Sequence, residues 1–487
     1  MLELFAIVLT IGALLYYTLH VSMWFIGVCA VVLAGFVIVI TRSRRGVVLA
    51  LIAGGALMLG AVSVWRVDTP IDRKIYGNRA FDARVLSVDR RIDRTNIVIV
   101  DTQHNQKLQV RSPQQVQVLP GDFVSVRGVV APIEDFVTDS GRVFAYEAYM
   151  GSKGIVGVVT KPIIGPVTDH EFALARVPTI LRYRIADIFA RYIQFPFDGV
   201  VAGMTVGYQG GLPDAISDLF RDTGVLHVLV LSGYNITLLA GFLGLMLKGV
   251  PFKLRSAITV IAILMLVLIS GAGVASVRAG VMGGIAVLAG LSVRTYQPMR
   301  ALVVAYLCFF FISPTMVFVD PGFHLSFLAT MFMILVLPKI EALFHWIPET
   351  QGIDLRELIM LAVSAPVFML PYLMYFSGNF PLSSPLANIV FAIVTPVIMI
   401  GGIVLVSLAF VPTLASIVGS LISVLGSFVL GLLELCARIP IWHTPPVPWW
   451  CVSLVYGALV FALFRREISE YMQQQYRMFR RQPSASG

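Results

Sequence analysis

Apolar segments long enough to cross a membrane occur along most of the chain. Three lie near the start, at 4–19, 23–40 and 47–65. Further candidates lie at 226–247, 257–270, 274–291, 302–312, 323–337, 358–376, 386–410, 414–436 and 450–464. Because about 20 apolar residues cross the hydrocarbon core of a bilayer, the pattern predicts a polytopic α-helical membrane protein with about 11 or 12 spans.

A polar segment from about residue 68 to 170 interrupts this pattern. Its apolar positions alternate in short runs at 81–89, 96–101, 107–111, 123–130 and 154–160. Period-two alternation between turns predicts a small β domain. Five strands fit an OB-like barrel, and they fit other small barrels as well. Acidic and basic residues nearly balance in this segment, which is not the charge of a strong phosphate binder unless a local basic patch forms.

The stretch 176–193 has the spacing of an amphipathic helix. Apolar side chains from Leu181 to Tyr192 recur on one helical face, and Arg182 and Arg191 lie off it. Two interpretations remain open, a helix at the membrane interface and a helix packed on the β domain.

Composition supports the membrane assignment. The 487 residues are 57% hydrophobic and 13% charged, and mean hydropathy is +0.85, whereas globular domains carry about 25% charged residues. The net charge of +9 is explained by membrane topology, since basic residues gather in the cytoplasmic loops of membrane proteins. The four cysteines and seven histidines are scattered, so no zinc site, other metal site or disulfide framework is expected.

Basic loops alternate consistently along the chain. Those at 42–45, 248–255, 294–300, 339–356 and 465–466 fall on one side, which we assign to the cytoplasm. The β domain and the loops near Asp320 and His443 then lie outside the cell. This topology divides the chain into a three-span segment at 1–67, the extracytoplasmic β domain at 68–170, the amphipathic helix at 171–197, a membrane domain at 198–466 and a cytoplasmic tail at 467–487.

Polar residues concentrate just before and within the first span of the membrane domain. The stretch 207–213 reads Gly-Tyr-Gln-Gly-Gly-Leu-Pro and is followed by Phe220, Thr223-Gly224, His227 and Leu231-Ser232-Gly233-Tyr234-Asn235-Ile236. Gly233 is a candidate break in the helix. Non-helical backbone at membrane depth is tolerated only where protein packs on it or it lines a wet cavity, and polar residues in spans are often functional.

In order and spacing, these motifs resemble the signature of the ComEC-type competence proteins. The resemblance continues at Ser-Val-Arg-Ala-Gly (276–280), Asp-Pro-Gly-Phe-His-Leu-Ser-Phe (320–327) and Ser-Pro-Leu-Ala-Asn (384–388), and at Phe144-Ala145-Tyr146, Tyr149 and Gly154-Ile155 in the β domain. It covers most of the chain. The family often has Leu-His after Ser-Gly, where this chain has Tyr234-Asn235.

The resemblance implies a channel, not an enzyme, that passes single-stranded DNA across the cell membrane during natural transformation. Many members carry a C-terminal metallo-β-lactamase-like nuclease domain with a His-x-His-x-Asp-His motif, which this sequence lacks. A separate nuclease, a DNA receptor or pilus system and a cytoplasmic motor are therefore the expected partners, besides single-stranded DNA and the bilayer. No cofactor is expected.

Ten residues are candidates for the DNA path: Tyr208, Gln209, His227, Ser232, Tyr234, Asn235, Arg278, Asp320, His324 and Asn388. Arginine in a span is costly, so Arg278 faces a pore or substrate, joins an ion pair or reaches toward the interface. For Asp320 a helix cap competes with a functional role. Packing competes with a path role for His324, Asn235 and Asn388.

Two other functions are compatible with the same residues. His227 and Ser232 would serve an intramembrane hydrolase, which also needs an oriented base and an oxyanion hole. A transporter of another envelope polymer or of lipid is the other alternative.

The topology is tested with a reporter that is active only in the cytoplasm. Fused after Arg466, it is expected to be active, and fused within 68–170 it is expected to be inactive, because the two positions lie on opposite sides of the membrane. The inverse pattern of activity contradicts the assignment.

Overall fold

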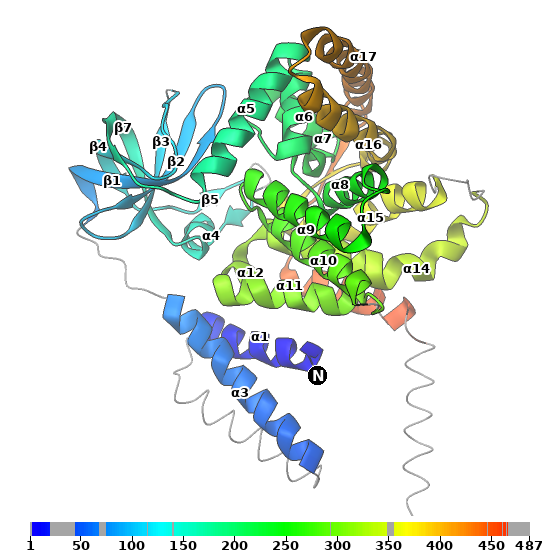
Figure 1. The fold of residues 1–487 in the computed structure, drawn as a ribbon. Coiled ribbons are helices and arrows are strands. Elements are labelled where there is room, and N and C mark those ends of the chain that lie inside the picture. Colours follow the sequence, from blue (N-terminus) through cyan, green and yellow to red (C-terminus); the bar gives the residue numbers. More distant parts are fainter. Residues whose placement is uncertain are drawn as a thin grey trace, which may run out of the picture.

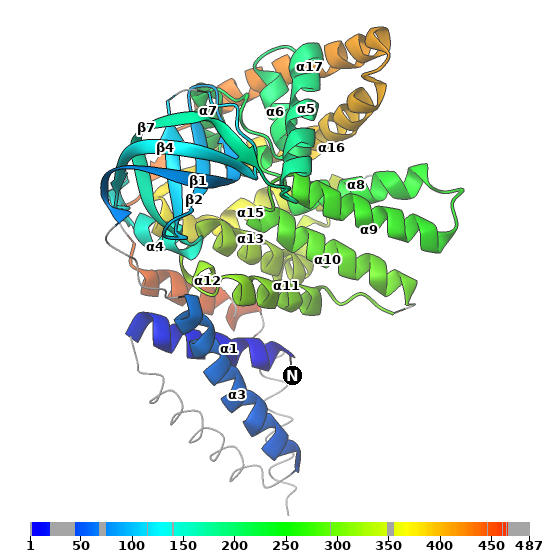
Figure 2. The ribbon, with the colours of Figure 1, turned by 60° about the vertical axis from the view of Figure 1, so that its left-hand side comes forward.

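The computed structural model describes residues 2–19, 44–67, 75–113, 115–138, 141–292, 294–347, 355–445, 447–459, 461–463 and 465. The expected span 23–40, the start of the basic loop at 42–45, Cys29 and the expected tail 467–487 lie outside these ranges. A β domain occupies one end of a helical bundle, and the helix pair of α1 (Leu2–Leu19) and α3 (Arg44–Val67) lies beside the bundle (Figures 1 and 2).

Five strands form the β domain. They are β1 (Gly77–Arg90), β2 (Thr95–Asp101), β3 (Lys107–Ser112), β4 (Asp122–Ala131) and β7 (Ile155–His170). Their pairing order is β1-β2-β3-β7-β4, and β4 also pairs with β1, so the sheet closes on itself as a barrel. Only the pairing of β3 with β7 is parallel within this barrel. The five alternating runs of the sequence therefore correspond to these five strands.

Alternation along each strand fills the barrel interior. In β2, Ile97 and Ile99 are buried and Val98 between them is partly exposed, as the two-residue side-chain period of a strand requires. Between β4 and β7 the chain adds a hairpin of β5 (Phe136–Val137) and β6 (Val143–Phe144), then the helix α4 (Tyr146–Ser152). The sequence pattern did not predict this insertion.

The bundle contains helices that differ widely in length. They are α5 (Arg176–Tyr192), α6 (Phe197–Val206), α7 (Asp214–Asp222), α8 (Gly233–Met246), α9 (Phe252–Ile269), α10 (Val274–Leu291), α11 (Pro298–Ile312), α12 (Met316–Val319), α13 (Pro321–Met331), α14 (Leu337–Ile340), α15 (Leu355–Phe376), α16 (Ser384–Leu408) and α17 (Pro412–Cys436). Short single turns η2 (Leu226–Leu229), η3 (Phe332–Val336) and η4 (Glu341–Phe344) and the strand pair β8 (Asn379–Pro381) and β9 (Ile441–His443) complete it.

Six helices in the described ranges are long and apolar enough to cross a membrane, and several shorter apolar helices accompany them. The protein is thus a multi-pass helical membrane protein. The expected span at 226–247 is interrupted, because η2 ends at Leu229, residues 230–232 are not helical and α8 begins only at Gly233.

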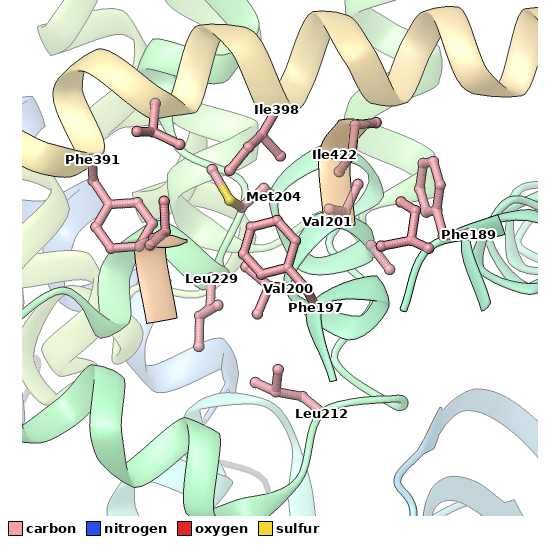
Figure 3. Packing of buried hydrophobic residues seen from close by; sticks show 14 of the residues in the cluster. Phe189, Phe197, Val200, Val201, Met204, Leu212, Leu229, Phe391, Ile398 and Ile422 are labelled. Carbon is pink, nitrogen blue, oxygen red and sulfur yellow. The ribbon is translucent and has the colours of Figure 1, made fainter. Parts of the chain in front are cut away.

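The short helix α6 is the centre of the largest apolar cluster. Its residues are buried except Asp198, and they pack against Phe189 of α5, Ile398 of α16 and Ile422 of α17 (Figure 3). Helix α5 packs on both domains: Phe189 joins this cluster, and Tyr183 donates a hydrogen bond of 3.1 Å to the Val88 carbonyl of β1. Of the two interpretations of this stretch, packing on the β domain is therefore found.

Glycines allow α17 to approach its neighbours. A Cβ atom on Gly419 would overlap the backbone carbonyl of Tyr192, whereas a Cβ atom on Gly431 would meet nothing within 4 Å. Both glycines lie on the same helix, which makes them a matched pair.

We expect Gly419→Ala to lower the stability of the detergent-solubilised protein by about 1–3 kcal/mol, because the overlap forces backbone shifts in a packed interior. Gly431→Ala is expected to be neutral or slightly stabilising. Thermal unfolding of the two purified variants measures the difference, and equal melting temperatures would contradict this account of the packing.

Candidate functional site

The break before α8 brings polar groups of three helices together. Ser232 precedes the first turn of α8, and its hydroxyl donates a 3.3 Å hydrogen bond to Oδ1 of Asn235. The Asn235 amide donates to the Met204 carbonyl of α6 at 2.8 Å, and Ser276 of α10 lies 3.4 Å from the Leu231 carbonyl. Helices α6, α8 and α10 are thus joined by side chains that form hydrogen bonds with buried backbone carbonyls.

Arg278 of α10 lies against this break. Its side chain is buried, with 7% of the residue exposed, and Nη2 lies 3.5 Å from the position that a Cβ atom would take on Gly233. Nε is buried without a hydrogen-bond partner, and in the part of the chain that the structure describes no carboxylate lies within ion-pair distance of it. The site therefore holds a cation next to irregular backbone.

Gln209 contacts the β domain, and Tyr208 contacts the helix α5 that packs on it. Helix α6 ends at Gly207, whose φ of +69° turns the chain toward the barrel. Gln209 then accepts a 2.9 Å hydrogen bond from Arg91 in the β1–β2 loop, and its amide reaches the Leu229 carbonyl at 3.4 Å. Gln209 therefore connects the barrel to the segment that leads into the α8 break.

An aromatic contact supports the same connection between the barrel and the bundle. The Tyr208 ring meets the Tyr183 ring edge-on at 5.6 Å, and the Arg90 guanidinium lies 4.3 Å from the centre of the Tyr183 ring. Burial raises the pKa of both tyrosines. The phenols therefore stay neutral at physiological pH and act as packing and hydrogen-bonding groups.

The remaining candidates are spread over the bundle. His227 on η2 and Tyr234 on α8 are exposed. Asn388 bonds the Ser384 carbonyl of its own helix at 2.8 Å. The Ser232 hydroxyl bonds Asn235, and among the described contacts none joins it to His227.

Asp320 and His324 have structural partners near the start of α13. Asp320 caps the helix by accepting a 3.1 Å hydrogen bond from the Phe323 amide. His324 has both ring nitrogens engaged, Nε2 with the Val317 carbonyl and Nδ1 with the Tyr372 hydroxyl, each at 2.8 Å. A carbonyl only accepts, so Nε2 carries the proton and Tyr372 donates to Nδ1.

A second contact between the barrel and the bundle was not predicted from the sequence. Arg142, beside strand β6, is buried and donates to the carbonyls of Met374 in α15 and Pro445, the latter at 2.9 Å. It lies so close to Gly378 that a Cβ atom there would overlap the guanidinium. A lone arginine in a loop gives no periodic signal, and only the pairing of distant segments reveals it.

Comparison with known proteins agrees with the motifs. A family model described as "Competence protein" matches residues 204–468, a range that contains all ten candidate residues. The chain is 24% identical over 311 residues to "ComE operon protein 3" of Bacillus subtilis (strain 168), in an alignment that covers 61% of this chain and 39% of the relative. The chain thus spans well under half of that protein. No solved structure matches.

Asn235→Leu is expected to destabilise the solubilised protein by about 1–3 kcal/mol, because it leaves the buried Met204 carbonyl without its donor. Thr237→Val is the control on the same helix, since Thr237 is exposed and bonds only the Gly233 carbonyl of its own turn. A similar loss of melting temperature in both variants would contradict a joining role for Asn235.

Proposed function

Because the chain belongs to the competence protein family, we propose that it is a membrane channel that passes single-stranded DNA across the cytoplasmic membrane during natural transformation. The observation that carries the proposal is Arg278, a cation without a carboxylate partner among the described residues, held beside the irregular backbone of 230–232. The proposal includes no catalytic step.

The physical argument concerns the cost of this arginine. A charged side chain inside a span costs about 2.5–3.5 kcal/mol on insertion scales, and such residues mark substrate pathways in membrane proteins. A passing DNA phosphate would supply the negative charge that Arg278 lacks. Ser232 and Asn235 beside it add polar groups to the same region, as a wet route requires.

The barrel is the proposed receiving domain. Its order places β4 beside β1 in the arrangement 4-1-2-3, which is the Greek-key pattern, and five-stranded Greek-key barrels of the OB type bind oligonucleotides. We propose that this barrel is OB-like and lies outside the cell. The loops that carry Lys248 and Arg294, and the start of α11 with Arg300, would then face the cytoplasm.

We propose that the channel works together with other proteins. A nuclease that removes the second strand, a receptor or pilus system that delivers DNA and a cytoplasmic motor that pulls the strand are the expected partners. Within the residues that the structure describes, no three His, Cys, Asp or Glu side chains converge as metal ligands.

Uptake of labelled DNA into the cytoplasm of a competent host tests the function. Arg278→Ala is expected to reduce internalised label about tenfold to a hundredfold, since a hydrogen bond to a charged group contributes about 1.5–3 kcal/mol. Arg278→Lys is expected to retain part of the activity, and Arg300→Ala, on an exposed arginine, is the control. Unchanged uptake in Arg278→Ala, at equal protein levels in the membrane, would overturn the proposal.

A further inference from the structure

The insertion between β4 and β7 gathers aromatic rings on the barrel surface. Phe136 and Phe144 of the β5–β6 hairpin lie 5.4 Å apart between ring centres, and Tyr146 and Tyr149 of α4 lie 6.2 Å apart with an interplanar angle of 28°. Phe144 lies 5.7 Å from the Tyr149 ring and so joins the two pairs. We call these four residues the aromatic platform.

The platform is accessible. Phe136 is 49% exposed, and the other three rings are partly exposed. Such a cluster is unusual on a solvated surface, where aromatic side chains are normally buried. Tyr146 and Tyr149 also pack against a small buried cluster of Ile133, Met150 and Ile155, so packing explains one side of these rings and leaves the outer side open to a ligand.

Two cations lie on the rings of the platform. Arg111 of β3 donates a 2.6 Å hydrogen bond to the Tyr146 hydroxyl, and its guanidinium lies 5.8 Å from the ring centre. The Lys153 ammonium lies 4.0 Å from the centre of the Tyr149 ring. Aromatic rings with interleaved cations are the features that bind single-stranded nucleic acids, the rings by stacking on bases and the cations by contact with the backbone.

A surface pocket of about 460 Å³ adjoins the platform. Its lining consists of Arg111, Phe136, Tyr146, the segment 131–134 at and after the end of β4, which includes Glu134, and Val158 and Thr160 of β7. This volume lies within the range of small-molecule sites, about 300–1,000 Å³. The Glu134 carboxylate repels phosphate, so the pocket suits an inserted base better than a backbone phosphate.

One of the loops that such barrels commonly use is already occupied. In OB-type barrels the loop between the first two strands contributes to oligonucleotide binding. Here Arg91 of that loop donates to Gln209, and Arg94 lies 4.0 Å from the Asp214 carboxylate of α7. The loop therefore docks on the membrane domain, and the platform presents the exposed rings instead.

The rings continue from the platform into the bundle. Phe144 meets Phe376 of α15 at 5.8 Å, Phe376 stacks on Tyr372 at 6.1 Å and 9°, and Tyr372 meets His324 of α13 at 5.7 Å. The platform is thus connected by contacting rings to the ends of α13 and α15.

We propose that the aromatic platform, with Arg111 and Lys153, binds the bases of single-stranded DNA by stacking and presents the strand at the end of α15. This inference rests on the proposed function, since it names a binding site for the same substrate. It places the binding site at the β5–β6 hairpin and α4, and not at the β1–β2 loop that OB-type barrels commonly use.

Binding of a fluorescently labelled oligothymidylate to the purified full chain in detergent tests the site, measured by fluorescence anisotropy. Tyr146→Ala and Phe136→Ala are each expected to weaken binding about fivefold to a hundredfold, because stacking on one ring contributes that much per base. Tyr146→Phe keeps the ring and is expected to bind nearly as the wild type does. Phe172→Ala and Arg127→Ala, both exposed and outside the platform, are the controls.

The outcomes separate this inference from the proposed function. Wild-type binding that Tyr146→Ala and Phe136→Ala leave unchanged would overturn the platform, and so would tighter binding of a duplex of equal length. A wild-type protein that does not bind the oligonucleotide also overturns it, while uptake by the Arg278 variants independently decides the channel function. Equal melting temperatures of Tyr146→Ala and the wild type establish that lost binding is not lost folding.

Discussion

Close packing around α6 is the constraint on which the rest of the structure depends. This helix is buried along almost its whole length, and its glycines admit neighbouring backbone: a Cβ atom on Gly203 would lie 2.7 Å from the Leu229 carbonyl oxygen, and one on Gly199 would lie 2.7 Å from that of Gly211. The chain that leaves α6 therefore folds back against it. This return brings Gln209 to the barrel and Ser232 close to Arg278. Both positions therefore depend on the packing of the chain against α6.

The sequence predicted features that arise from local periodicity. The five strands follow from alternation that every barrel strand needs, and the long spans follow from hydropathy alone. A break near Gly233 was predicted, and in the structure the irregular backbone before α8 extends back to Val230, where the Leu231 carbonyl accepts a hydrogen bond from Ser276 of α10. For Asp320 a helix cap and a functional role were both considered, and the hydrogen bond that it accepts from the Phe323 amide identifies it as the cap of α13.

Features that depend on contacts between distant segments could not be predicted. Tyr208 and Gln209 were candidates for the DNA path because they offer a stacking ring and a polar side chain, and their actual partners, Tyr183 and Arg91, belong to other elements. The aromatic platform is more visible in the sequence, since Phe144, Tyr146 and Tyr149 lie within six residues of one another. Their exposure, however, is a property of the folded surface and has no counterpart in the linear pattern.

The Arg142 contact has a mechanical consequence. One guanidinium nitrogen donates to two carbonyls, at the end of α15 and at Pro445, and hydrogen bonds weaken steeply when the donor–hydrogen–acceptor angle falls below about 120°. A tilt of α15 must therefore carry Arg142 and the hairpin with it or break the bond to the Met374 carbonyl. The β5–β6 hairpin and the end of α15 are thus coupled at this arginine, so that a motion of α15 that keeps the bond intact also moves the hairpin on the barrel surface.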